Sequence, residues 1–112
     1  MELQIRQSEG FILVATEGPL DDEARTQFNE LLHPLATAAG SKLLIDLSQT
    51  PRVTSNGLGA LVSLVAWANA HGARVVLSSP SEFVMSVFKA TRLDTYLNIA
   101  PTDEEGRRRV QA

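Results

Sequence analysis

Apolar and polar positions alternate along the first part of the chain and then follow a helical period. Leu3 and Ile5 alternate with polar residues, and residues 11–15 are mostly apolar. The turn signal at residues 8–10 between these two segments predicts a β-hairpin. From Asp21 onward the apolar residues have the spacing of an amphipathic helix. They are Ala24, Phe28, Leu31, Leu32, Leu35 and Ala39.

The ends of this first predicted helix carry suitable residues. The carboxylates at positions 21–23 place negative charge at the positive N-terminal end of the helix. Gly40 suits the C-terminal end. Pro34 removes one backbone N–H, so we expect the helix to kink or split near His33.

Two further strands and a helix between them follow. Residues 43–47 are almost uniformly apolar, which is typical of a buried parallel strand. After a loop through residues 50–52, apolar residues at helical spacing predict a helix that ends near Gly72. Residues 74–77 predict the next strand. The apolar positions of the helix are Leu58, Leu61, Val62, Val65 and Ala68.

Two capping boxes mark the last two helices. Residues 79–82 predict a helix with proline at its first position, and residues 102–105 begin a terminal helix that runs through Val110. A short strand is expected at residues 96–99. The order is therefore β-β-α-β-α-β-α-β-α, an α/β fold whose mixed, mostly parallel sheet has the hairpin as its antiparallel edge. We expect a single domain over residues 1–112.

Composition excludes several classes of protein. The 112 residues carry a formal charge of −3 and are 44% hydrophobic, which does not fit a disordered chain. The absence of cysteine excludes disulfides and thiolate chemistry. Mild acidity and few aromatic residues give no indication of nucleic-acid binding. Because no apolar run approaches the ~20 residues that span a bilayer, and no secretory signal pattern is present, we expect no membrane insertion and a cytoplasmic location.

Signals for catalysis are sparse. His33 precedes a helix-breaking proline and His71 lies at a helix end, and both positions favour a structural role. No HExxH motif, GxSxG motif or metal-ligand cluster is present. Residues 57–59 (Gly-Leu-Gly) lack the third glycine of a dinucleotide fingerprint, since Val62 occupies that position, and they lack the lysine of a P-loop. We therefore expect no catalytic residue, metal or cofactor, although a weaker anion site at this helix start stays open.

The segment at residues 53–59 is the most informative. Thr54, Ser55 and Asn56 are all good helix-capping residues, placed where one would suffice. In one interpretation Ser55 is the N-cap and the glycines permit close packing of the helix on the sheet. In the other, Ser55 is a switch beyond the carboxyl end of a parallel strand, where functional sites gather in α/β sheets. A phosphate there would add about −1.5 to −2 charge.

Several segments, in this order, are similar to one known family. They are Gly-Pro-Leu-Asp at 18–21, Leu-Ile-Asp-Leu-Ser at 44–48, Ser-Asn-Gly-Leu-Gly-Ala-Leu at 55–61, and residues 70–77 and 84–99. Together with the hairpin they cover nearly the whole chain. They resemble the STAS domain, the fold of bacterial anti-sigma factor antagonists and of the cytoplasmic domains of sulfate transporters.

The resemblance implies a function and a modified residue. In antagonists of the family the loop commonly reads Asp-Ser-Ser/Thr-Gly-Leu-Gly, and its first serine, here Ser55, is phosphorylated. An anti-sigma factor that is also a serine kinase binds the unmodified antagonist and releases its sigma factor. The kinase then uses ATP and magnesium to phosphorylate the serine and dissociates, and a serine phosphatase reverses the step. Here Thr54 stands in place of the usual Asp, and Asn56 in place of Ser or Thr.

We expect a protein-binding, non-enzymatic antagonist whose partner surface surrounds Ser55 and includes part of the helix that follows Ser81. One alternative is a STAS scaffold, such as a transporter-associated subunit, in which Ser55 only caps a helix. Another is a small α/β nucleotide-binding enzyme that uses residues 57–59. The candidate partner-binding residues are Arg52, Thr54, Ser55, Asn56, Gly57, Met85 and Lys89.

Overall fold

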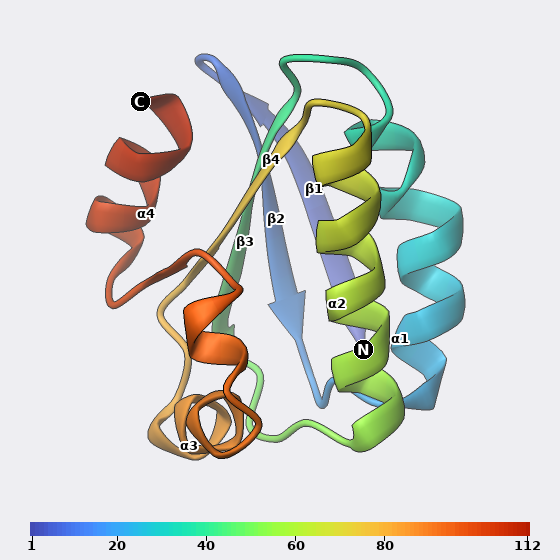
Figure 1. Ribbon diagram of the computed structural model, residues 1–112, viewed down its shortest axis with the longest axis vertical. Coiled ribbons are helices and arrows are strands. Elements are labelled where there is room, and N and C mark those ends of the chain that lie inside the picture. Colours follow the sequence, from blue (N-terminus) through green and yellow to red (C-terminus); the bar gives the residue numbers. More distant parts are fainter.

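A five-stranded sheet forms the centre of the computed structural model, which describes residues 1–112 (Figure 1). The strands lie side by side in chain order. The first two are antiparallel and the remaining pairs are parallel, which confirms the predicted hairpin and mostly parallel sheet. The strands are β1 (Glu2–Ser8), β2 (Phe11–Glu17), β3 (Lys42–Gln49), β4 (Arg74–Ser78) and β5 (Ile99–Ala100).

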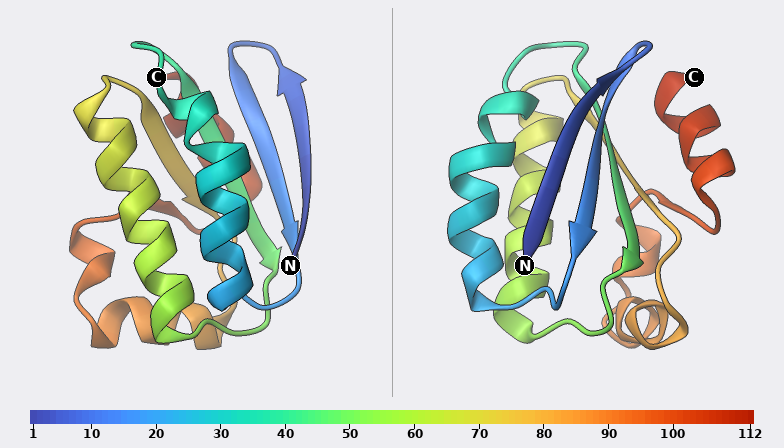
Figure 2. Two further views of the ribbon diagram at one scale, coloured as in Figure 1. Left: turned by 90° about the vertical axis from the view of Figure 1, so that its right-hand side faces the viewer. Right: turned by 180° about the vertical axis from the view of Figure 1, so that it is seen from behind.

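Helices cover both faces of the sheet. Two helices lie side by side on one face, another covers part of the opposite face, and α3 lies at the end of the sheet where β3 and β4 stop (Figures 1 and 2). None of the helices has the length and apolar character needed to cross a membrane. The helices are α1 (Asp22–Gln27) and α2 (Ser55–Ala70) on the first face, α3 (Glu82–Ala90), and α4 (Asp103–Gln111) on the opposite face.

The apolar run in β3 is buried on both of its sides. Leu43, Ile45 and Leu47 belong to a cluster of 20 buried residues that includes residues of α1, α2 and α3. Leu44 points the other way, into a cluster of 5 buried residues that includes Val110 of α4. Because successive strand residues face opposite sides, a strand between two helix layers carries apolar residues on both of its faces.

The helix containing Pro34 is split as predicted. After α1 the chain makes a π-helical turn at Phe28–Leu32 and then a 3-10 turn at Pro34–Ala36. The backbone N–H of His33 donates to the carbonyl of Phe28 at 2.9 Å, one residue further back than in an α-helix. Proline supplies no N–H and its ring crowds the preceding turn, so the regular α-helical bonding cannot continue there.

Two predicted boundaries near the end of the chain are wrong. Ser81, not Ser79, caps α3, because its side chain accepts from the N–H of Val84 at 3.1 Å, and Pro80 therefore lies outside the helix. The last strand begins at Ile99 rather than at residue 96. The N–H of Leu97 instead donates to the carbonyl of Leu93 at 2.8 Å, in a helical turn that the short apolar run did not reveal.

Asp103 fixes the start of α4 to the end of β4. The hydroxyls of Ser78 and Ser79 donate to its Oδ1 at 2.8 Å and 2.7 Å. Burial alone would raise the pKa of the Asp103 carboxyl, but the hydrogen bonds from Ser79 and Ser78, together with the positive charge of Arg107, hold that pKa below its ordinary value of 3.8. The charged form is therefore the one that binds α4 to the sheet.

Replacing Asp103 should destabilise the protein at neutral pH. We expect Asp103→Ala to lower the free energy of unfolding by about 1–3 kcal/mol, because the fully buried Ser78 hydroxyl loses its acceptor. Glu104→Ala, at an exposed neighbouring position, is the control and should change it by less than about 0.5 kcal/mol. Since the Asp103 pKa is lowered by folding, its contribution is present above pH 3.8 and is lost as the pH falls through its folded value. Urea unfolding at neutral and acidic pH measures both effects, and equal losses from the two variants would contradict this role of Asp103.

Candidate functional site

Two loops meet beyond the carboxyl end of β3, where α2 begins. The N–H of Gly18 donates to the carbonyl of Gln49 at 3.0 Å, and the N–H of Leu20 donates to the carbonyl of Arg52 at 3.0 Å. The N–H of Thr54 donates back to the carbonyl of Leu20 at 2.9 Å. The loop between β2 and α1 is thus held alongside the loop between β3 and α2 by backbone bonds alone (lower part of Figure 1).

Thr54, not Ser55, is the N-cap of α2. Thr54 has an extended backbone, its hydroxyl accepts from the N–H of Gly57 at 3.2 Å, and its carbonyl accepts from the N–H of Leu58 at 2.8 Å. Ser55 is the first residue of the helix, is exposed, and takes no part in the cap. The interpretation of Ser55 as the N-cap is therefore wrong. Leu20 holds the Thr54 backbone in place, so the helix begins after Thr54.

The glycines of the first turn of α2 permit close packing. A Cβ atom on Gly57 would lie 1.9 Å from the carbonyl oxygen of Leu20, a distance that no side chain can occupy. A Cβ atom on Gly59 would lie 3.0 Å from a terminal guanidinium nitrogen of Arg25 in α1. Both glycines therefore approach the β2–α1 loop and α1 rather than the sheet, and neither lines an open phosphate loop.

Most predicted partner-binding residues are exposed around this helix start. Arg52, Thr54, Ser55 and Asn56 are all exposed, whereas Gly57 is buried and shapes the site without offering contact area. Their surface is polar, not the flat apolar surface typical of an obligate interface.

The second predicted surface lies on α3, which is at the same end of the molecule as the start of α2 (Figure 1). Lys89 is exposed, while Met85 is half-buried and packs against the large core cluster. Met85 also lines a cavity of about 300 Å³ together with Pro80, Glu82, Ile99 and Pro101.

Sequence reasoning missed the contribution of α1 and the loop before it. Leu20 fixes the start of α2, and the Arg25 guanidinium lies against its first turn. Nothing in the local pattern of either residue indicates a contact more than 30 positions away. The Gly-Leu-Gly spacing at residues 57–59 was the available signal, since two glycines in one helical turn indicate close approach by another segment.

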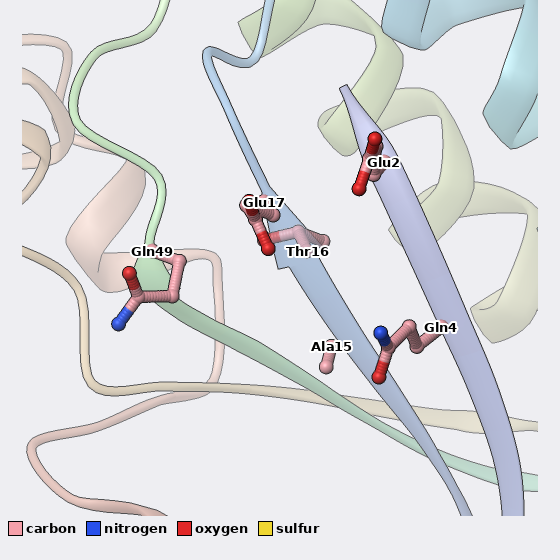
Figure 3. A pocket seen from close by; sticks show the side chains of 6 residues that line it. All are labelled: Glu2, Gln4, Ala15, Thr16, Glu17 and Gln49. Atoms are coloured by element: carbon pink, nitrogen blue, oxygen red, sulfur yellow. The ribbon is translucent and has the colours of Figure 1, made fainter.

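The cavities of the protein lie away from this site. None of the four is lined by a residue between positions 50 and 59. Figure 3 shows one of about 200 Å³, where the cross-strand pair Glu2 and Glu17 lies near Gln4 and Gln49. The hydroxyl of Thr16 in its lining is buried and bonded to Thr50 at 2.7 Å, so this recess offers no free nucleophile.

The two histidines lie together at the opposite end of α2. The rings of His33 and His71 both lie against Trp67, with centroids 5.1 Å and 4.4 Å from that of the indole. Nδ1 of His71 is 2.8 Å from the carbonyl oxygen of Trp67. Burial lowers the pKa of His33, which favours its neutral form. The packing of both rings agrees with a structural role.

Comparison with known proteins identifies the family. The STAS domain model matches residues 2–106, and the chain belongs to the STAS domain family. The anti-sigma-B factor antagonist of Bacillus subtilis is 28% identical over 106 residues, which cover 95% of this chain and 96% of that relative.

Solved structures show the same fold. A protein from Thermotoga maritima superimposes with a TM-score of 0.88 and 22% identity, covering 98% of this chain and 95% of that one. The anti-sigma factor antagonist SpoIIAA, from Bacillus, in its unphosphorylated form has a TM-score of 0.75 and 22% identity, with 98% and 96% covered. SpoIIAA has also been solved in its phosphorylated form, with a TM-score of 0.69.

The contact between Gly57 and Leu20 can be tested with a matched pair of variants. Gly57→Ala places a Cβ atom 1.9 Å from backbone that cannot rotate away, and we expect it to lower the free energy of unfolding by at least about 2 kcal/mol. Gly59→Ala meets only the end of a flexible arginine, so it should be neutral or stabilising by up to about 1 kcal/mol, the usual gain of alanine over glycine in a helix. Thermal and urea unfolding distinguish the two, and a Gly57→Ala protein as stable as the parent would contradict the packing described.

Proposed function

We propose that this protein is an anti-sigma factor antagonist switched by phosphorylation of Ser55. The unmodified protein binds an anti-sigma factor that is also a serine kinase, and so frees the sigma factor. Phosphorylation of Ser55 ends that binding, and a serine phosphatase restores it. The observation that carries the proposal is an exposed serine hydroxyl in the first turn of α2, next to a threonine that already caps the helix.

The position of Ser55 suits a switch that leaves the fold intact. A phosphate on the first residue of α2 lies at the positive end of a helix, where an anion is stabilised by about 0.3–1 kcal/mol. Excluding a phosphate dianion from water inside an interface costs several kcal/mol unless the partner supplies cations. Phosphorylation of Ser55 therefore weakens partner binding by more free energy than it adds to the stability of the folded protein. It opposes binding while it favours the fold.

The relatives support this assignment. The Bacillus subtilis relative and SpoIIAA are both anti-sigma factor antagonists, and SpoIIAA has been solved in phosphorylated and unphosphorylated forms. In this proposal the chain catalyses nothing, since ATP, magnesium and the phosphoryl-transfer machinery belong to the kinase. Because such a kinase draws on cellular ATP, the proposal places the protein in the cytoplasm.

We further propose how the partner docks. Arg52, Thr54 and Asn56 are exposed beside Ser55 and would form the first contact surface, with buried Gly57 shaping it. Lys89 and the accessible part of Met85 on α3, at the same end of the molecule, would form the second (Figure 1).

Phosphorylation at Ser55 can be tested directly. The protein is incubated with Mg-ATP and each anti-sigma-type serine kinase of its own genome, and the modified residue is mapped by mass spectrometry. We expect one phosphate, on Ser55, and none on the Ser55→Ala variant. Modification only at another residue, or none by any of these kinases, would contradict the switch.

The effect of charge on partner binding is tested with a second pair of variants. Ser55→Asp should weaken binding to that kinase at least about tenfold, because it places a negative charge in the interface. Ser63→Asp adds the same charge to another exposed position of α2 and should leave the affinity within about twofold. Isothermal titration calorimetry measures both affinities. Equal affinities for the parent and Ser55→Asp would overturn the proposal.

A further inference from the structure

Arg25 extends from α1 across the first turn of α2. Its terminal guanidinium nitrogen lies 3.0 Å from the position that a Cβ atom on Gly59 would occupy, so only glycine leaves the guanidinium this much room. Gly59 and Ser55 are four residues apart in α2 and therefore lie on the same side of the helix, about 5–6 Å apart. The guanidinium is thus one helical turn from the Ser55 side chain.

Both side chains lean toward the same end of the molecule. In an α-helix, side chains lean toward the N-terminus. The N-termini of α1 and α2 lie at the same end of the molecule (Figures 1 and 2). At that end, the backbone of α2 at Gly57 contacts the loop before α1 at Leu20.

Arg25 forms no ion pair within the protein. The two ion pairs of the structure, Arg108–Glu105 and Arg109–Glu105, both lie within α4. The carboxylate of Asp21, four residues before Arg25, accepts from the N–H of Glu23 at 3.2 Å as the N-cap of α1. An exposed arginine beside a glycine, without an ion-pair partner, is available to an anion that arrives later.

We propose that Arg25 binds the phosphate of phosphorylated Ser55. The inference rests on the proposed function for the phosphate itself, and adds the residue that receives it. The guanidinium offers two parallel N–H donors to a phosphomonoester dianion. It also offsets the repulsion between that dianion and the acidic residues at the start of α1, Asp22 and Glu23. Arg25 thereby holds the phosphate in one position at the start of α2, within the surface that a partner would approach.

The test uses protein with phosphoserine inserted at position 55 during translation, so that no kinase is needed. Phosphorus NMR as a function of pH gives the second pKa of the phosphate, which is ordinarily about 6. We expect this pKa to be higher in Arg25→Gln than in the parent by about half a unit or more, because the dianion loses its cation. Arg52→Gln, on the loop before α2, is the matched control and should shift it by less than half as much. In the nitrogen–proton spectrum, the Nε–H signal of Arg25 should move on phosphorylation.

The two failures are distinguishable. If Arg25→Gln leaves the phosphate pKa unchanged, or if Arg52→Gln shifts it as much, the role of Arg25 is overturned and the proposed function is untouched. If no kinase modifies Ser55, the proposed function fails, while the phosphate titration still decides whether this arginine binds a phosphate at that position. Folding of Arg25→Gln is verified from the same spectrum, and the exposed position makes it a mild substitution.

Discussion

The first turn of α2 lies directly against the backbone of Leu20, and the candidate site depends on that contact. Because Gly57 has no side chain, the helix approaches the β2–α1 loop until only backbone atoms separate them. Two backbone hydrogen bonds hold the same two segments together. The N–H of Leu20 donates to the carbonyl of Arg52, and the N–H of Thr54 donates to the carbonyl of Leu20. The support beneath Ser55 is therefore made of backbone, which has few alternative conformations, rather than of side chains that can rotate.

The three polar residues at this junction have different roles. Thr54 satisfies the helix cap, Ser55 is left with an exposed hydroxyl, and Asn56 follows it on the surface. A modification of Ser55 would therefore remove no hydrogen bond of the cap. In the proposed switch, the phosphate changes charge and shape where a partner would dock, while Arg25 and the helix end compensate for it within the domain.

Much of the fold follows from local patterns. The hairpin, the doubly buried strand β3, the split at Pro34 and the start of α4 each depend on residues close together in sequence, so spacing and capping rules predict them. The errors occur where a tertiary contact decides the outcome. Ser79 has a positive φ of 55° and donates to Asp103, so it cannot cap α3. The chain around Leu97 looks apolar enough for a strand but forms a helical turn.

The sequence predicted the right segment for the site, but the interpretation that made Ser55 the N-cap was wrong, because Thr54 has that role. Three adjacent capping residues in the sequence cannot show which one is the cap, because that depends on where the Leu20 carbonyl holds the Thr54 N–H. The approach of Arg25 to Gly59 depends equally on how α1 and α2 lie together. Such long-range contacts depend on the packed fold, and the only local sequence signal for them is the pair Gly57 and Gly59.

The central claim is that Thr54 caps α2 and leaves Ser55 free to be modified without cost to the fold. Urea unfolding of Thr54→Ala and Ser55→Ala, compared with the parent, tests it most directly. The account predicts that Thr54→Ala lowers the free energy of unfolding by about 1 kcal/mol, as loss of an N-cap does, and that Ser55→Ala changes it by less than about 0.5 kcal/mol. A larger loss from Ser55→Ala than from Thr54→Ala would contradict the account.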